Sequence, residues 1–436
     1  MNIAGTGRAV KTLIALVAAV VAGGTAFADV KSGYTGSAKC AKCHKQQMVS
    51  WSETLHSRFM RSPTNDATLK ELHVFSASAP VAVARVAYVL GNMHKLVFLE
   101  NIADRLVPIE HQYDVDKRAW EPFSRDLWDH HAGSRKEDSS NVPDWYERCA
   151  GCHTTGYDPK SRTFVESSIA CEHCHGPGAK HSETLHRDDI VNPATASDAL
   201  RIYVCAQCHS RGEGTTDHLP YPTGFLPGSD LSKVFVFDAP VPDKATDMFW
   251  ENGAAKQHHS QFNELRQSKH FENGLACFDC HQVHRFRNVK SASTATRLMA
   301  FTDRYLTHRR SQFVCLRCHD ANSLGYQVFT TSGDGKLIDQ HTKHPPAISK
   351  SPLQKDGKNA ITRSLLCSDC HMPRLERETS GYNIHSHRFQ LDTSDIAKKA
   401  NAPSACLQCH TDKDRSWLAT SLKAWEKNNS SDGSKH

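Results

Sequence analysis

The chain has 436 residues, of which 39% are hydrophobic and 23% charged, with a formal net charge of +6. Beyond a short N-terminal stretch, no segment is apolar enough to cross a bilayer, which excludes a polytopic membrane protein. The composition is marked instead by 16 cysteines and 28 histidines, so we expect chemistry at thiol and imidazole groups.

The N-terminal residues have the pattern of an export signal. Arg8 and Lys11 flank the start of an apolar stretch over residues 12–24, and Ala26-Phe27-Ala28 fits a small-x-small cleavage site. We expect residues 1–28 to be a signal peptide. The mature chain would then be periplasmic, or exported further to the cell surface, with no membrane span after removal of the signal.

All the cysteines fall into eight Cys-x-x-Cys pairs, and a histidine follows each pair at once. Numbered in chain order, the motifs are site 1 (Cys40, Cys43, His44), site 2 (Cys149, Cys152, His153), site 3 (Cys171, Cys174, His175), site 4 (Cys205, Cys208, His209), site 5 (Cys277, Cys280, His281), site 6 (Cys315, Cys318, His319), site 7 (Cys367, Cys370, His371) and site 8 (Cys406, Cys409, His410). This is the signature of c-type haem attachment. Two thiols on a tight turn add to the two vinyl groups of one porphyrin, and the histidine supplies the proximal ligand of the iron.

Zinc ribbons or eight disulfides would also use paired cysteines, but neither requires a histidine directly after every pair. At this histidine content, eight chance matches in eight have a probability on the order of 10⁻¹⁰. We therefore expect eight haem c groups as cofactors. Their propionates would bring the mature chain from about +4 to about −12 when fully reduced, or about −4 when oxidised. The basic composition thus gives no reason to expect a nucleic-acid partner.

The haem motifs divide the chain. We expect a first haem segment over residues 29–60, a haem-free β-rich insert over 61–148, a seven-haem domain over 149–428 and a disordered tail over 429–436. Alternating hydrophobic residues predict strands over 81–90, 94–100 and 105–113 in the insert. The insert would serve as a cover over the first haems or as a docking module, and we favour the cover.

The predicted fold is mainly α, with long loops wrapped around a core of stacked c-type haems and a small β-meander between the first and second sites. The haem faces would supply the apolar surface that the side chains lack. A C-terminal helix is expected over Asp412–Asn428, capped by Asp412 or Asp414, with Trp417, Leu418, Leu422 and Trp425 on one side.

A low-spin haem needs a second axial ligand, and histidine is far more plentiful here than methionine. Mainly bis-histidine haems of low potential are therefore predicted. The candidate distal ligands are His56, His181, His218, His270, His284, His344 and His385. The reserve candidates are His387, His341, His131 and His259, whereas His186 and His436 are left out.

Several stretches resemble multihaem cytochromes related to hydroxylamine oxidoreductase and to the small tetrahaem cytochrome that accepts its electrons. They are the segments around sites 1, 3, 4, 5 and 7, among which Gly-Pro-Gly-Ala-Lys-His after site 3 and Cys-His-Met-Pro at site 7 are the most specific. The resemblance is closest to octahaem members, some of which continue into tetratricopeptide repeats, whereas this chain stops soon after site 8. It implies closely packed haem pairs and favours His181, His218, His284 and His385 as ligands.

Two functions are open. The first is an electron carrier that works by outer-sphere hopping along bis-histidine haems. Its partners would be redox proteins: a quinol-side donor, a terminal reductase or an outer-surface cytochrome. The alternative is a multihaem oxidoreductase of a small nitrogen or sulfur oxyanion or a hydroxylamine-type substrate, with one open-site haem and anion-binding groups such as Arg309 and Arg310. We favour the carrier and assign no catalytic residue.

Overall fold

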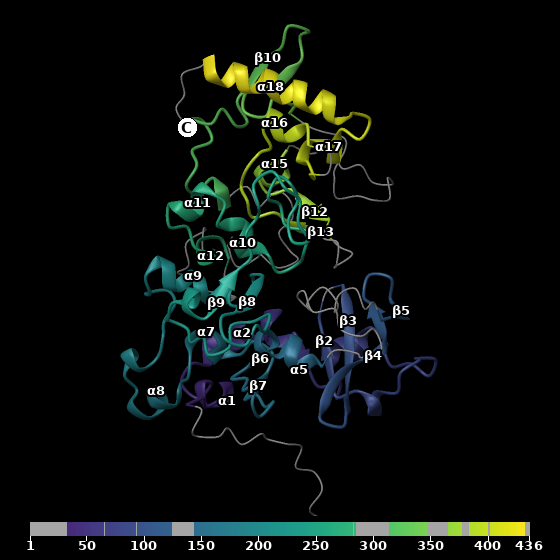
Figure 1. Ribbon diagram of the computed structural model, residues 1–436, viewed down its shortest axis with the longest axis vertical. Coiled ribbons are helices and arrows are strands. Elements are labelled where there is room, and N and C mark those ends of the chain that lie inside the picture. Colours follow the sequence, from purple (N-terminus) through teal and green to yellow (C-terminus); the bar gives the residue numbers. More distant parts are fainter. Residues whose placement is uncertain are drawn as a thin grey trace, which may run out of the picture.

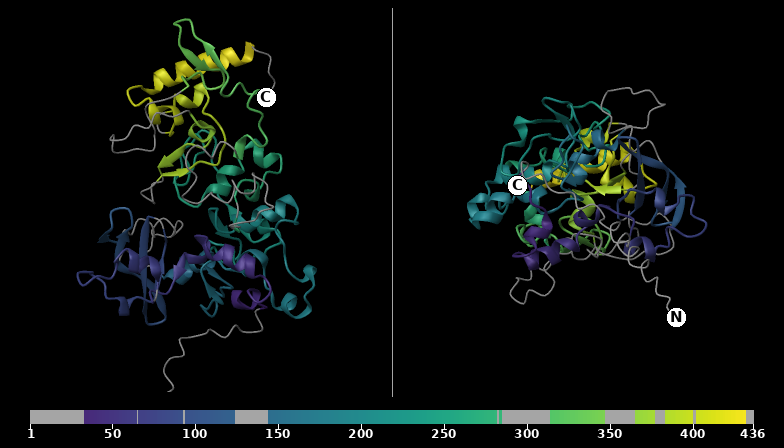
Figure 2. Two further views of the ribbon diagram at one scale, coloured as in Figure 1. Left: turned by 180° about the vertical axis from the view of Figure 1, so that it is seen from behind. Right: turned by 90° about the horizontal axis from the view of Figure 1, so that it is seen from below.

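The computed structural model describes residues 33–64, 66–92, 94–123, 144–281, 283–284, 314–346, 365–376, 383–399 and 402–431. The molecule is elongated, with sites 1 and 3 near one end and the C-terminal helix α18 (Arg415–Ser431) at the other (Figure 1). A sheet stands beside the half that contains sites 1 to 4, as the view from behind also shows (Figure 2). The expected signal peptide, His131, Arg309 and Arg310 lie outside the described residues.

Helices other than α18 are short, and several coincide with a haem motif. They are α1 (Ser37–Cys40), α2 (Lys45–Ser52), α3 (Ala67–Glu71), α5 (Trp145–Arg148), α6 (Ala150–His153), α7 (Cys171–His175), α8 (Ala179–Thr184), α9 (Asp198–Ala206), α10 (Gln261–Leu265), α11 (Lys269–Glu272), α12 (Cys277–Cys280), α15 (Cys367–His371), α16 (Ser394–Ala397) and α17 (Ala405–Cys409). Single 3₁₀ turns add η2 (His56–Arg58), η3 (Val83–Arg85), η4 (Arg187–Asp189) and η5 (Leu231–Lys233). Long loops connect these pieces.

One antiparallel sheet has the strand order β1-β2-β3-β4-β5 and lies between sites 1 and 2 in the sequence. Its strands are β1 (Met60–Arg61), β2 (Tyr88–Leu90), β3 (Lys95–Ile102), β4 (Arg105–Asp114) and β5 (Ala119–Pro122). Strands are therefore present within each of the three predicted stretches. The first is shorter than expected because Val83–Arg85 forms the turn η3 and leaves only Tyr88–Leu90 paired.

Four two-stranded pairs complete the β structure, so the described chain has mixed content rather than the mainly helical content we expected. The pairs are β6 (Thr154–Thr155) with β7 (Glu166–Ser167), β8 (Gly212–Gly214) with β9 (Phe235–Phe237), β10 (Phe329–Thr331) with β11 (Leu337–Asp339), and β12 (Arg374–Glu376) with β13 (Asn383–His385).

Both faces of the large sheet are buried. Successive side chains of a strand point to opposite faces, so Phe98 and Leu99 of β3 enter different clusters. Phe98 packs with Trp120, their ring centroids 4.8 Å apart. Both belong to the core of the sheet module, by which we mean the strands β1 to β5 and the segments that connect them. Leu99 packs in a cluster with Trp145 and Ala150, which belong to α5 and to site 2. The second cluster therefore fixes the sheet against a haem motif.

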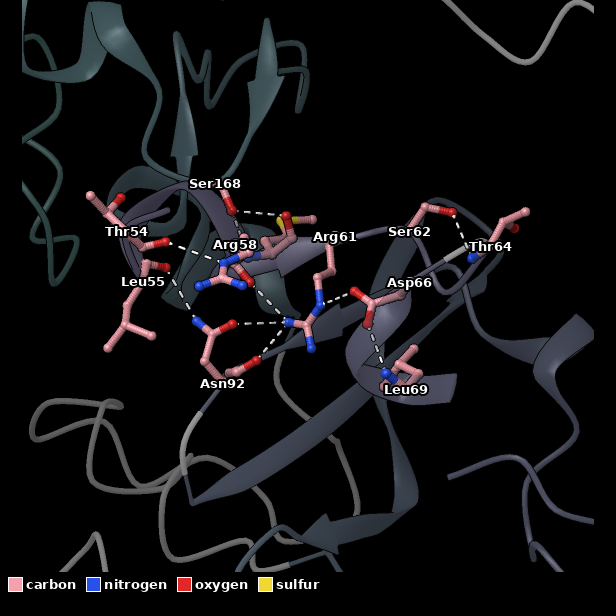
Figure 3. Close-up of polar contacts among 12 residues, drawn as sticks. Thr54, Leu55, Arg58, Arg61, Ser62, Thr64, Asp66, Leu69, Asn92 and Ser168 are labelled. Atoms are coloured by element: carbon pink, nitrogen blue, oxygen red, sulfur yellow. Dashed lines mark hydrogen bonds and ion pairs between the residues drawn. The ribbon is translucent and has the colours of Figure 1, made fainter. Parts of the chain in front are cut away.

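Arg61 connects the sheet to the first haem segment through polar contacts (Figure 3). Its guanidinium forms an ion pair with Asp66 and donates to the carbonyl of Gly91 at 2.6 Å. Asn92 then donates to the carbonyl of Leu55 at 3.2 Å, directly before His56. Burial lowers the pKa of Arg61, and Asp66 offsets part of that shift. These contacts connect the sheet to the backbone that carries His56.

The C-terminal helix is close to its predicted position. Leu418 and Leu422 are buried against Ala397 of α16, and the carboxylate of Asp414 accepts from the N–H of Trp417 at 2.8 Å. The helix runs to Ser431, so it extends into the expected tail. Within the described part of the chain, no helix combines the length and the apolar character needed to span a bilayer.

Replacing Phe98 by Ala should destabilise the sheet module by about 3–5 kcal/mol, because the ring is fully buried and its loss leaves a cavity. Ile102→Ala on the same strand is the matched control, since Ile102 is 54% exposed. Guanidinium unfolding followed by far-ultraviolet circular dichroism measures both. Equal losses for the two variants would contradict this packing.

Candidate haem sites

Each Cys-x-x-Cys-His motif forms a compact helical turn. At six sites the histidine N–H donates to the carbonyl of the first cysteine, as in His209 to Cys205 at 2.9 Å. The motifs of sites 3 and 7 lie within α7 and α15. This turn brings two thiols and one imidazole together, as thioether attachment and axial ligation require. All sixteen cysteines are free of disulfide bonds.

A second histidine faces the histidine of every motif. The ring centroids of the eight pairs lie 5.9–6.3 Å apart: His44 with His181, His153 with His259, His175 with His284, His209 with His56, His281 with His387, His319 with His270, His371 with His341, and His410 with His344. The two members of a pair are separated in the sequence by 30 positions at site 7 and by as many as 153 at site 4.

This spacing fits two imidazoles on opposite sides of one iron. A metal–imidazole bond of about 2 Å, with about 1 Å more from the nitrogen to the ring centre, puts the centroids roughly 6 Å apart. His259 also lies 6.2 Å from His209. Because His209 already faces His56, whereas His153 faces His259, a one-to-one assignment gives His259 to site 2. The residues present therefore fit eight bis-histidine haems.

Different local structures supply the second histidines. His181 lies on α8, His270 on α11 and His56 on η2. His341 and His344 both lie in the loop after β11 and serve two neighbouring sites, 7 and 8. His259 has a left-handed backbone, with φ of 60°, which is uncommon outside glycine and turns the chain sharply before α10.

Five of the seven candidate distal ligands face a motif histidine in the structure, and two do not. His56, His181, His270, His284 and His344 each face a motif histidine. His218 instead has a side chain 63% exposed, 3.5 Å from Glu213. His385 donates from Nδ1 to the carbonyl of Met372 at 2.6 Å, and His387, two residues later, takes the position opposite His281.

Three of the histidines that lie opposite a motif histidine were only reserve candidates in the sequence analysis: His259, His341 and His387. Each has another histidine within three positions: His258, His344 and His385 respectively. The sequence shows that a ligand is available in each of these stretches, but the choice between close neighbours depends on the backbone. The rings of the consecutive residues His258 and His259 lie 4.4 Å apart, and it is the second whose ring lies 6.3 Å from that of His153.

Burial keeps several of these imidazoles in the neutral form that can bind a metal. Desolvation lowers the pKa of His153, His209 and His387 to about 4 each, and it lowers the pKa of His259 well below its usual value. At neutral pH these rings therefore keep a nitrogen lone pair free for coordination without first losing a proton.

The motifs touch one another through their cysteines. Direct thiol contacts join site 1 to site 3 (Cys40, Cys171), site 2 to site 4 (Cys152, Cys208), site 4 to site 5 (Cys205, Cys277) and site 6 to site 7 (Cys315, Cys367). Other contacts join site 3 to site 4, where Cys208 lies 3.4 Å from His173, and site 5 to site 6, where Arg317 donates to the carbonyl of Asp279 at 3.5 Å, while α15 packs against α17 and so brings site 7 beside site 8. Site 4 thus has three neighbouring sites, 2, 3 and 5.

Arg211 places a buried positive charge beside sites 2 and 4. It follows site 4 by two residues, and its Nε donates to the carbonyl of His258 at 3.0 Å. Burial lowers its pKa to about 10, so it remains charged at neutral pH. Its backbone is held by Asn263 of α10, which accepts from the Arg211 N–H at 2.8 Å and donates to the Arg211 carbonyl at 2.9 Å.

Comparison with known proteins points to cytochromes. Residues 39–79 and 114–176 match the family model described as cytochrome c554 and c-prime. The matched segments hold sites 1, 2 and 3 together with His56, whereas β2, β3 and nearly all of β4 fall between them. Cytochrome c-554 of Nitrosomonas europaea is 24% identical over 233 residues, which cover 48% of this chain and 72% of that protein.

Two solved cytochrome structures resemble this chain to different degrees. The crystal structure of the outer cell wall cytochrome OcwA superposes with a TM-score of 0.56 at 23% identity, over 91% of this chain and 87% of that one. An undecahaem cytochrome from the S-layer of Carboxydothermus ferrireducens covers 91% of this chain and 60% of its own, at 18% identity and a TM-score of 0.45. The superposition with OcwA shows that the two chains share a similar fold over most of their length.

Gly151→Ala should disrupt site 2, because a Cβ at this position would lie 2.1 Å from the ring of Tyr221. Overpacking of this kind costs about 1–3 kcal/mol. We expect a lower melting temperature and the loss of one haem per chain in the pyridine haemochrome assay. Gly333→Ala is the control, since no atom lies within 4 Å of its added Cβ. Full haem content in Gly151→Ala would contradict this close packing.

Proposed function

We propose that this chain, a multihaem c-type cytochrome, binds eight haems with two histidine ligands each and conducts electrons along them. The motif histidines would be the proximal ligands. The distal ligands would be His181 (site 1), His259 (site 2), His284 (site 3), His56 (site 4), His387 (site 5), His270 (site 6), His341 (site 7) and His344 (site 8). When bound, haem supplies an iron that gains and loses one electron at each site.

The observation that carries this proposal is the pairing of all eight motif histidines. At each site the two histidines would both hold the haem iron and would leave no position on it for a substrate. The protein's work is then to hold both ligands in place through each change of oxidation state. Such a site suits outer-sphere transfer, in which no bond at the metal forms or breaks.

The contacts between motifs support a continuous path. Contacts between neighbouring motifs connect sites 1, 3, 4, 5, 6, 7 and 8 in that order, with site 2 attached to site 4. Along the molecule this order runs from α1 and α7 near one end to α15 and α17 near α18, while α5 lies toward the sheet (Figure 1). Electrons would enter and leave at sites 1, 8 and 2, which lie at the ends of this path.

The alternative function, a reductase or dehydrogenase with an open-site haem, needs a motif histidine that faces no second histidine. Each of the eight faces one, so the pairing favours the carrier. The expected signal peptide supports export, and the partners would be redox proteins on either side of the periplasm. The sheet module would cover site 2, as its packing with Ala150 suggests.

Low-temperature EPR of the oxidised protein, with haem counted by pyridine haemochrome, tests the proposal. We expect eight haems, all low-spin. A high-spin haem that shifts on addition of nitrite, hydroxylamine or sulfite would overturn the carrier function in favour of the oxidoreductase.

Distal-ligand variants test the assignment. His259→Ala should convert one of eight low-spin haems to high-spin, because it removes the imidazole opposite His153. His218→Ala should leave the spectrum unchanged, since His218 lies exposed beside Glu213. The opposite result, with a spectral change only in His218→Ala, would return the ligand role to the sequence candidate.

A further inference from the structure

The two residues between the cysteines of a motif attach nothing to a haem, yet several of them contact a neighbouring site. Glu172 of site 3 gives the clearest case. Its side chain is within α7, and the residue is only 1% exposed. Its two carboxylate oxygens accept from the N–H groups of Thr35 at 2.9 Å, Gly36 at 2.7 Å and Gly178 at 2.7 Å.

These three N–H groups belong to the two segments that build site 1. Thr35 and Gly36 lead directly into α1, which ends at Cys40 and precedes His44. Gly178 directly precedes α8, which carries His181. One carboxylate of site 3 therefore holds both halves of the site 1 ligand pair, whose ring centroids are 6.2 Å apart.

The same arrangement recurs along the path. Gln207 of site 4 donates to the carbonyl of His173, inside the motif of site 3, at 3.1 Å. Asp279 of site 5 accepts two hydrogen bonds, at 2.7 and 2.8 Å, from Arg201 on α9, the helix that leads into site 4. Gln408 of site 8 donates to the carbonyl of Arg374 at 3.1 Å, three residues after site 7.

We propose that Glu172, Gln207, Asp279 and Gln408 are positioning residues that connect their own site to a neighbouring one and thereby set the spacing and relative orientation of the haems at those sites. The inference rests on the proposed bis-histidine sites. Three of these contacts are hydrogen bonds with the backbone, and the fourth is an ion pair in which one nitrogen of Arg201 lies within hydrogen-bond distance of both oxygens of Asp279. Because electron hopping falls steeply with separation, such contacts would keep the transfer rates uniform along the path.

Glu172→Gln is the direct test, because an amide keeps the shape of the side chain but replaces one acceptor oxygen with an NH₂ group. That group would face N–H donors and lose the hydrogen bonds on its side. We expect all eight haems to be retained, with a changed magnetic coupling between sites 1 and 3 and a high-spin signal of up to one haem at site 1. Glu183→Gln, an exposed change on α8 itself, is the matched control.

Arg201→Gln provides a second variant outside any motif. It removes the ion pair with Asp279 and should alter the coupling between sites 4 and 5 while leaving sites 1 and 3 as in the wild type. A residue that merely stabilised the fold would lower the melting temperature without a pair-specific change in the EPR spectrum.

Wild-type spectra for both variants, whatever their melting temperatures, would overturn the positioning role. A wild-type protein with fewer than eight haems, or with a high-spin haem of its own, would instead overturn the proposed function. The two failures are therefore distinguishable in the same set of spectra.

Discussion

The pairing of two imidazoles across a gap of about 6 Å is the constraint on which the rest of the structure depends. A motif histidine is placed by its own helical turn, but the second histidine comes from elsewhere in the chain, from His56 for site 4 and from His387 for site 5. The loops must therefore run between sites in three dimensions rather than in sequence order. This requirement explains why helices are short and why so much of the described chain is irregular.

Buried polar side chains help to position the paired histidines. Buried carboxylates and amides such as Glu172 and Gln207 take backbone hydrogen bonds that short helices cannot satisfy internally. Glu264 on α10 is likewise fully buried, and its oxygens accept from the N–H groups of Ala255 and His387. A buried polar group left without a partner would be strongly destabilising. These hydrogen bonds are therefore kept in the folded protein, and they hold in place the backbone that carries a paired histidine, as at His387.

The sheet module depends less on the haem motifs for its packing than the rest of the described chain does. It has its own core around Phe98 and Trp120, and it is joined to the haem segment through Arg61 and Asn92. Two of its strands and most of a third fall outside the segments that match the cytochrome family model. It therefore resembles an insertion whose other face was adapted to pack against α5 and site 2.

The sequence by itself indicated haem attachment, because thioether bonds and proximal ligation are local and need only five consecutive residues. It also indicated the strands of the sheet, through alternation of hydrophobic residues, and the C-terminal helix, through its apolar side and Asp414. It could not decide between His258 and His259, or between His385 and His387, since neighbouring residues differ only in the direction that the folded backbone gives them. Only the tertiary structure decided which histidines lie opposite each other and which sites are neighbours, because both depend on contacts between residues that are separated in the sequence, by 30 positions for His341 and His371 and by 153 for His56 and His209.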